Sequence, residues 1–124
     1  MKERMSMTNE EMVMQYFKFI ENRDIEGILE LFDYDATIYE PFSKSNGLQG
    51  KSSIEPFLRV AMMANSKMKR TIEILKSSDA KSDPNKLVAL ITFQKGDKAR
   101  GRFTFEFISN ENIKKIKSLH IEFL

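Results

Sequence analysis

The spacing of apolar residues changes about halfway along the chain, and this change restricts the possible folds. Before residue 65 the apolar residues recur three and four positions apart, as on one side of an α-helix. From Lys67 onward they alternate with polar residues, as on a strand with one buried face. Short polar segments of hairpin length separate the later runs. The pattern therefore predicts an α+β domain in which three helices cover one face of a mainly antiparallel sheet.

Two helices are predicted near the start, after a flexible lead-in over residues 1–7. Thr8 and Glu11 have the spacing of a capping box, which satisfies free backbone donors at a helix start. Asp24 is placed to cap the second helix, which we expect to close at residues 33–35. The expected apolar faces are Met12, Val13, Tyr16, Phe17 and Ile20 on the first helix and Ile25, Ile28, Leu29 and Phe32 on the second.

One strand and a third helix are predicted in the middle of the chain. A short β-rich run over residues 36–40 is followed by a polar, Gly-containing loop over residues 42–50. Ser52 and Glu55 repeat the capping-box spacing, and Pro56 would fall in the first turn of the helix that they begin. Four strands are predicted after this helix, over residues 67–75, 87–95, 99–108 and 116–124, with turns at 77–85, 96–97 and 109–112.

Composition excludes several classes of function. The chain has no Cys and one His, which excludes disulfides and thiolate metal sites, and we expect neither a metal nor another cofactor. The 20 basic and 18 acidic residues are interspersed, so we expect no nucleic-acid partner. Apolar runs are far shorter than the roughly 20 residues that span a bilayer, and the first residues lack the apolar core of a signal peptide. We therefore expect no membrane association, a cytoplasmic location and one domain over residues 1–124.

The last two strands each have one apolar and one polar side. The apolar sides, which should face the helices, carry Phe103, Phe105 and Phe107 on one strand and Leu119, Ile121 and Phe123 on the next. The polar sides carry Arg102, Thr104 and Glu106, and then Ser118, His120 and Glu122. A row of large rings either fills a core or lines a cavity, and the alternation is compatible with both.

The first half of the chain carries a combination of short motifs. These are Asp24-Ile25 at a helix start, Leu31-Phe32 before Asp35-Ala36, Glu40-Pro41 at a strand end, and the run from Gly50 through Ile54 to Phe57. Together with Lys115-Ile116 at a late strand start, they resemble the nuclear transport factor 2-like superfamily. This superfamily includes the SnoaL-like polyketide cyclases and the ketosteroid isomerases. The resemblance implies a cone-shaped, strongly bent sheet wrapped around the helices, with a pocket at its open end.

The resemblance also implies two site residues. Tyr16 matches the tyrosine that donates a hydrogen bond to the enolate in ketosteroid isomerases, and Glu40 matches the carboxylate that moves the proton. The second donor of those isomerases, an aspartate, corresponds to Phe103, which donates nothing. The implied function is a pocket for a small apolar molecule, with proton transfer on a carbonyl compound of the isomerase or cyclase type. The expected wall of this pocket comprises Phe17, Phe32, Ile38, Phe57, Met62, Phe103, Phe105, Leu119 and Ile121.

Two other classes of function remain open: a binding protein without turnover, and an interaction module whose cone is filled by side chains. In the superfamily the outer sheet face commonly packs against a second copy, which implies a homodimer through the face bearing Arg102, Glu106, Ser118 and His120. His120 and Glu122 lie on this outer face and are interpreted as surface or subunit contacts.

Two further charge patterns are interpreted as surface features. Arg100 and Arg102 are expected to form cross-strand ion pairs with Glu106. Lys67, Lys69 and Arg70 form a short basic cluster, which is interpreted as a solvated strand end.

Overall fold

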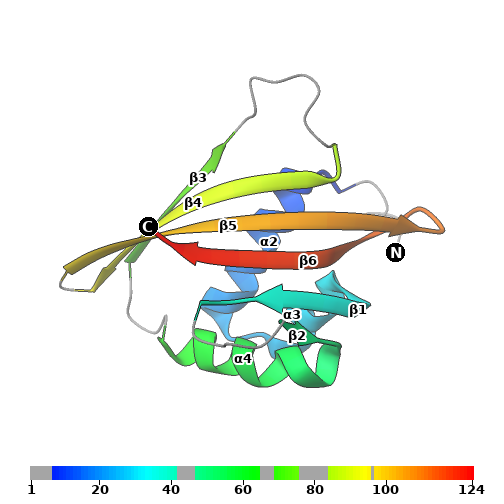
Figure 1. The fold of residues 1–124 in the computed structure, drawn as a ribbon, viewed down its shortest axis with the longest axis horizontal. Coiled ribbons are helices and arrows are strands. Elements are labelled where there is room, and N and C mark those ends of the chain that lie inside the picture. The colour runs from blue at the N-terminus through cyan, green and yellow to red at the C-terminus, as the bar shows by residue number, and fades with distance from the viewer. Residues whose placement is uncertain (1–6, 42–46, 65–68, 76–83, 96) are drawn as a thin grey trace.

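The computed structural model describes residues 7–41, 47–64, 69–75, 84–95 and 97–124. In this part of the chain three helices lie on one side of a curled six-stranded sheet (Figure 1). The helices are α2 (Asn9–Asn22), α3 (Ile25–Leu31) and α4 (Lys51–Ala64). The strands are β1 (Phe32–Tyr39), β2 (Leu48–Gln49), β3 (Lys69–Leu75), β4 (Lys86–Lys95), β5 (Asp97–Asn110) and β6 (Ile113–Phe123). The predicted α+β class is confirmed.

The sheet has the strand order β2-β1-β6-β5-β4-β3. Consecutive strands from β3 to β6 pair antiparallel, and β2 pairs antiparallel with β1. β1 and β6 pair in parallel, with a register shift between Phe32 and Thr37. The prediction of a mainly antiparallel sheet is therefore confirmed, and the parallel pair joins the first half of the chain to its last strand.

Two of the three predicted helix caps are present, those of α2 and α3. The Thr8 hydroxyl accepts a hydrogen bond from the Glu11 N–H at 3.1 Å, and the Glu11 carboxylate accepts one from the Thr8 N–H at 2.8 Å. The Asp24 carboxylate accepts from the Gly27 N–H at 2.9 Å and starts α3. Met7, which the sequence places in a flexible lead-in, packs against the core, and residues 1–6 lie outside the described residues.

The second helix is shorter than predicted. It ends at Leu31, and Phe32 has an extended backbone (φ −91°, ψ 144°) and begins β1. Phe32 was wrongly assigned to the apolar face of the helix because it lies four residues after Ile28. Its pairing with Ile116 of β6 places it in the sheet instead. The strand ends at Tyr39, so Glu40 follows it directly.

The start of the third helix was also predicted wrongly. α4 begins at Lys51, and the Gly50 carbonyl accepts from the N–H groups of Ser53 and Ile54 at 3.0 Å each. Gly50 therefore takes the capping position assigned to Ser52, and its φ of +87° suits a glycine. Pro56 consequently falls in the second turn of the helix.

The predicted loop over residues 42–50 contains a strand that the sequence did not indicate. β2 is two residues long, and Leu48 pairs with Ile38 of β1. Gly47 precedes it at a φ of +104°, where a Cβ would lie 2.8 Å from the Thr37 side chain. Residues 42–46 lie outside the described residues.

The late strands follow the predicted order with longer bounds. β5 extends to Asn110 and β6 begins at Ile113, so the predicted turn at 109–112 narrows to Glu111 and Asn112, both with positive φ. The expected turn at Gly96-Asp97 is described only at Asp97, which begins β5. Residues 65–68, 76–83 and 96 lie outside the described residues, and with them most of the turn predicted at 77–85.

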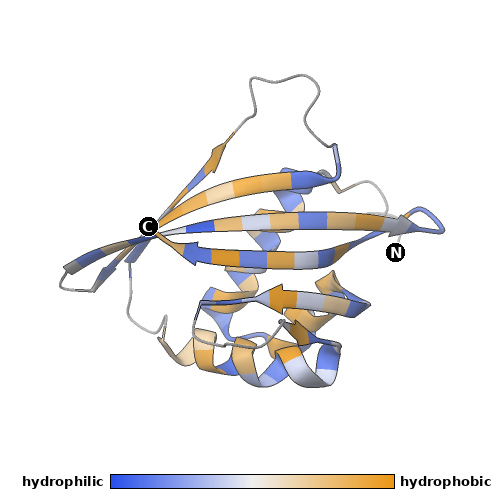
Figure 2. Ribbon diagram, viewed as in Figure 1, coloured by the Kyte–Doolittle hydropathy of each residue, from blue (hydrophilic) through white to orange (hydrophobic). Residues whose placement is uncertain are grey.

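Hydrophobic and hydrophilic residues alternate along β5 and β6 (Figure 2), and the apolar side of each strand contributes buried residues to the core. Phe103, Phe105 and Phe107 are buried, and successive rings of this row stack at centroid distances of 6.5 and 6.4 Å. Each buried ring contributes on the order of 1.5–3 kcal/mol to stability through loss of apolar surface to water. The row forms an aromatic floor against which α2 packs through Tyr16 and Phe17.

None of the helices in the described part of the chain combines the length and the apolar character that crossing a bilayer requires.

Candidate functional site

A cavity of about 660 Å³ lies between α2, α4 and the curled sheet, near the end of β6. Val60 and Phe123, at its wall, are 63% and 51% exposed, so they mark its open side. The helices contribute Tyr16, Phe17, Ile20, Pro56, Phe57, Val60, Ala61 and Ala64 to the wall. The strands and the segment after β1 contribute Glu40, Pro41, Arg70, Phe93, Ala99, Phe103, Ile121 and Phe123.

The structure brings part of the predicted site together in this wall. Tyr16 and Glu40 both line the cavity, together with Phe17, Phe57, Phe103 and Ile121. The remaining residues predicted for the pocket lie in the buried core away from the cavity wall: Phe32, Ile38, Met62, Phe105 and Leu119. The row of rings on β5 is therefore divided, because Phe103 borders the cavity and Phe105 fills the core.

Tyr16 is held by three aromatic rings. Its ring meets those of Phe17, Phe105 and Phe32 edge-on at centroid distances of 5.0, 5.4 and 6.2 Å. The residue is 2% exposed, and burial raises the pKa of its hydroxyl, an effect that the positive charge of Arg70 partly offsets. The hydroxyl therefore stays protonated and able to donate a hydrogen bond.

Glu40 reaches the cavity from the segment that follows β1. The side chain of Ile38 is buried, and Glu40, two positions later, continues on the same side of the chain. Pro41 comes next in the cavity wall and cannot donate a backbone hydrogen bond to the sheet. The segment after β1 thus places the Glu40 carboxylate in the mostly apolar wall of the cavity.

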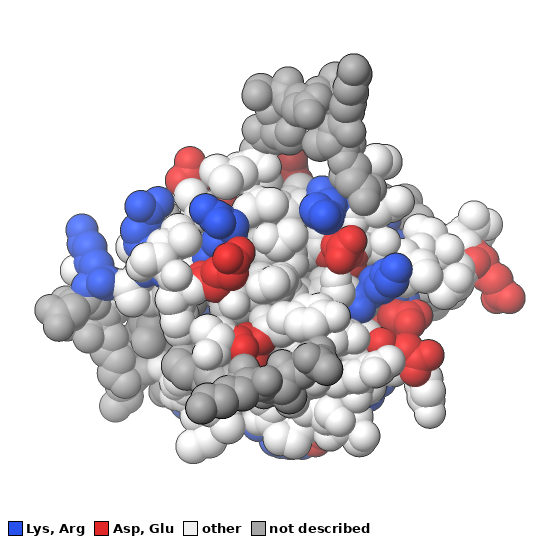
Figure 3. Space-filling view, in the orientation of Figure 1, with Lys and Arg blue, Asp and Glu red and all other residues white. Residues whose placement is uncertain are grey.

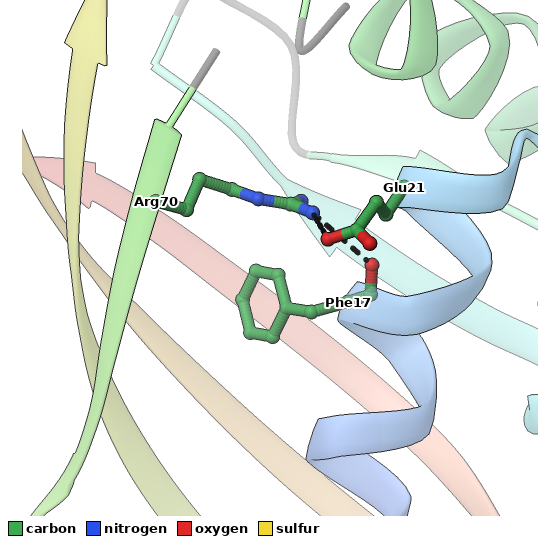
Figure 4. Close-up of polar contacts among 3 residues, drawn as sticks. All are labelled: Phe17, Glu21 and Arg70. Carbon is green, nitrogen blue, oxygen red and sulfur yellow. Dashed lines mark hydrogen bonds and ion pairs between the residues drawn. The ribbon is translucent and has the colours of Figure 1, made fainter. Parts of the chain in front are cut away.

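Arg70 is a cavity residue that the sequence interpretation missed. Its side chain is 7% exposed, and its Nη2 lies 3.1 Å from Glu21 Oε2 and 3.5 Å from the Phe17 carbonyl oxygen (Figure 4). The guanidinium carbon lies 5.8 Å from the centroid of the Phe17 ring, within the range of a cation–π contact. The other terminal nitrogen, Nη1, is buried and has no hydrogen-bond partner in the described structure.

A signal for this placement existed in the sequence. Arg70 shares the side of its strand with Ile72 and Ile74, and all three are partly buried. The interpretation of Lys67, Lys69 and Arg70 as a solvated strand end was therefore wrong for Arg70.

Residues on the outer face of the sheet form their own contacts. Arg102 Nη1 lies 3.7 Å from Glu122 Oε1, whereas Glu106 accepts a hydrogen bond from the Ser118 hydroxyl at 2.8 Å. The ion pair of Arg102 is thus with Glu122 and not, as expected, with Glu106. His120 is exposed, and its ring centroid lies 5.5 Å from that of Tyr39. Within the described residues no group of three His, Cys, Asp or Glu side chains is arranged to hold a metal.

Neither a protein-family model nor a curated protein sequence matches the chain. Solved structures do match. A protein of unknown function from Cytophaga hutchinsonii, described as NTF2-like (nuclear transport factor 2-like), superposes with a TM-score of 0.65 at 13% identity over 96% of this chain and 92% of its own. This chain has the NTF2-like fold.

Two further structures share this NTF2-like fold. The epoxide hydrolase/cyclase-like enzyme SalBIII, described in pyran ring formation in the polyether salinomycin, superposes with a TM-score of 0.69 at 21% identity, over 93% of this chain and 89% of its own. RV0760c of Mycobacterium tuberculosis, in complex with estradiol-17β-hemisuccinate, gives a TM-score of 0.63 at 21% identity over 89% and 88% of the two chains.

Proposed function

We propose that the cavity binds a small, largely apolar carbonyl compound and that the chain moves a proton on it. Glu40 acts as the base and Tyr16 as the hydrogen-bond donor. One observation carries this proposal: a protonated tyrosine hydroxyl and a carboxylate, on elements far apart in the sequence, line the same mostly apolar cavity. A volume of about 660 Å³ also falls within the range of roughly 300–1,000 Å³ typical of ligand pockets.

The chemistry follows from these two groups. The Glu40 carboxylate removes a proton from the carbon next to the carbonyl, and the electron pair of that C–H bond moves toward the carbonyl oxygen. The Tyr16 hydroxyl donates a hydrogen bond to this oxygen as negative charge develops on it. Protonated Glu40 then returns the proton to carbon, at the same or another position. Without the second donor of ketosteroid isomerases, since Phe103 occupies that position, stabilisation of the oxyanion depends on Tyr16.

Similar folds with related ligands support the class of compound. SalBIII is described as cyclase-like, and RV0760c was solved with a steroid ester, so this fold accommodates apolar ligands with oxygen substituents. The alternative of a cone filled by side chains is disfavoured by the cavity, which leaves turnover or binding without turnover.

Deuterium exchange separates these two functions. We would incubate the protein in D2O with 2-tetralone, a bicyclic ketone with exchangeable hydrogens next to its carbonyl, and follow their loss by NMR. The wild type should accelerate exchange, and Glu40→Gln should abolish the acceleration while it still binds the ketone. Glu55→Gln is the matched control, because Glu55 pairs with Arg59 at 2.8 Å outside the cavity.

Two results would contradict the proposal in different ways. If wild type and Glu40→Gln bind 2-tetralone equally and neither accelerates exchange, the chain is a binding protein without turnover. If neither binds the ketone, the interaction-module alternative is favoured instead.

We further propose that two copies associate through the outer face of the sheet. On this face, Lys and Arg side chains are interspersed with Asp and Glu around uncharged surface (Figure 3). Such a half-polar sheet face is suited to self-complementary packing about a twofold axis. Sedimentation velocity at micromolar concentration should give a dimer, and a monomer would refute this assignment.

A further inference from the structure

The unpartnered nitrogen of Arg70 is the least satisfied polar group in the cavity wall. A guanidinium offers five N–H donors, and the contacts of Arg70 to Glu21 and the Phe17 carbonyl involve Nη2 alone. Nη1 is buried without a partner among the described residues. A buried charged donor in that state destabilises the folded chain, so its presence in an apolar wall points to a group that completes its bonding.

The existing contacts do not explain the placement of the whole side chain. Glu21 is 74% exposed, and water therefore screens its charge from the guanidinium. The guanidinium carbon lies over the ring of Phe17, and this contact leaves Nη1 without a hydrogen-bond partner among the described residues. Among the described lining residues, Arg70 and Glu40 are the charged ones, so Arg70 supplies the positive charge of the wall.

We propose, building on the proposed function, that the ligand is a hydrophobic monocarboxylic acid whose carboxylate binds the Nη1 edge of Arg70. Its apolar body occupies the cavity, and its carbonyl group meets Tyr16 and Glu40. Carboxylate is favoured because a planar guanidinium binds it through charge-assisted hydrogen bonds. A second carboxylate on the ligand is disfavoured, because Glu40 must itself be ionised to act as the base.

A matched pair of probes tests the charge requirement. We would compare 2-naphthylacetate with 2-naphthaleneethanol, which has the same ring system and a neutral hydroxyl, by isothermal titration calorimetry. The wild type should bind the acid about tenfold or more tightly than the alcohol, as expected of a charge-assisted hydrogen bond. Arg70→Met should lose this preference and bind the alcohol as the wild type does.

Two further variants control for folding and net charge. Arg70→Gln keeps a polar side chain without the positive charge and should also lose the preference for the acid. Arg59→Met removes one positive charge from the exposed surface of α4 and should keep the preference.

The outcomes distinguish this inference from the proposed function. If the wild type binds the two probes equally, or prefers the alcohol, the inference is overturned while the cavity remains a ligand site. A preference for the acid that persists in both Arg70 variants overturns the role of Arg70. If neither probe binds the wild type while 2-tetralone does, the inference is overturned and the proposed function stands; if 2-tetralone also fails to bind, both are overturned.

Discussion

Replacing Tyr16 by Phe tests whether the hydroxyl belongs to a site or to the core. The substitution keeps the ring, and with it the edge-on contacts to Phe17, Phe105 and Phe32. It removes only the hydroxyl, which belongs to a residue of the cavity wall. If that hydroxyl serves the reaction alone, its removal should reduce activity without reducing stability.

The magnitude follows from these contacts. A hydroxyl that serves only the reaction makes no stabilising hydrogen bond within the fold, whereas a structural hydrogen bond contributes about 0.5–1.5 kcal/mol. The free energy of unfolding of Tyr16→Phe should therefore equal that of the wild type or exceed it by up to about 1 kcal/mol. Tyr16→Ala, which also removes the ring, should lose about 3–5 kcal/mol. Deuterium exchange of 2-tetralone should fall by about 10²-fold in Tyr16→Phe, as after loss of an oxyanion donor.

The assay is urea denaturation followed by far-ultraviolet circular dichroism, since the chain has no Trp for fluorescence. A loss of more than about 1 kcal/mol in Tyr16→Phe would refute the reasoning, because it would mean that the hydroxyl makes a structural hydrogen bond. Tyr16 would then be an ordinary core residue.

Three further predictions concern stability. Burial raises the pKa of Tyr16 in the folded state above its value in the unfolded chain. The free energy of unfolding should therefore be unaffected by this residue below pH about 10. Above that pH it should fall by about 1.4 kcal/mol per pH unit, because the tyrosine ionises in the unfolded chain and stays protonated in the folded one. Urea denaturation from pH 9 to 11 should show this added slope in wild type and not in Tyr16→Phe; equal slopes would contradict it. Phe105→Ala should lower the free energy of unfolding by about 3–5 kcal/mol, because Phe105 is 0% exposed. Tyr34→Ala should lower it far less, because Tyr34 is 80% exposed. Similar losses for the two variants in urea denaturation would argue against the aromatic floor. Thr8→Ala should lower the free energy of unfolding by about 1 kcal/mol, because it removes the hydroxyl that caps α2, whereas Thr8→Ser keeps that hydroxyl and should retain the stability. Thermal denaturation that ranks the two variants in another order would contradict the capping box.

The features that the sequence predicted well are local ones. Thr8 and Asp24 cap helices through residues three positions away, and the alternation of Phe103 and Phe105 with polar neighbours follows from strand geometry alone. Such features depend on adjacent residues, so spacing is enough to find them.

The features that it missed depend on distant partners. Phe32 fits a helical period, but its pairing with Ile116 assigns it to a strand. The two residues of β2 form a strand because β1 lies beside them. Arg70 donates hydrogen bonds to Phe17 and Glu21, which lie 53 and 49 positions earlier in the chain, on α2. The basic residues next to Arg70 in the sequence give no indication of these two partners. The division of the Phe row between cavity and core likewise depends on how α2 and α4 lie over the sheet.

The parallel pairing of β1 with β6 has a consequence for synthesis on the ribosome. β1 emerges early, but the neighbour that fills its second edge is the last strand of the sheet to be made. Phe32 and Ile38 of β1 are fully buried in the folded chain, but before β6 is made they lack the neighbouring strand beside which they pack. The edge of β1 that β6 later occupies is open during this time, and an open strand edge promotes association with other chains. The hairpins formed by β3, β4 and β5 do not depend on β1 and are free to form first. A nascent chain halted before β6 would therefore contain the antiparallel strands β3, β4 and β5 and the helices, but not the strand that joins β5 to β1.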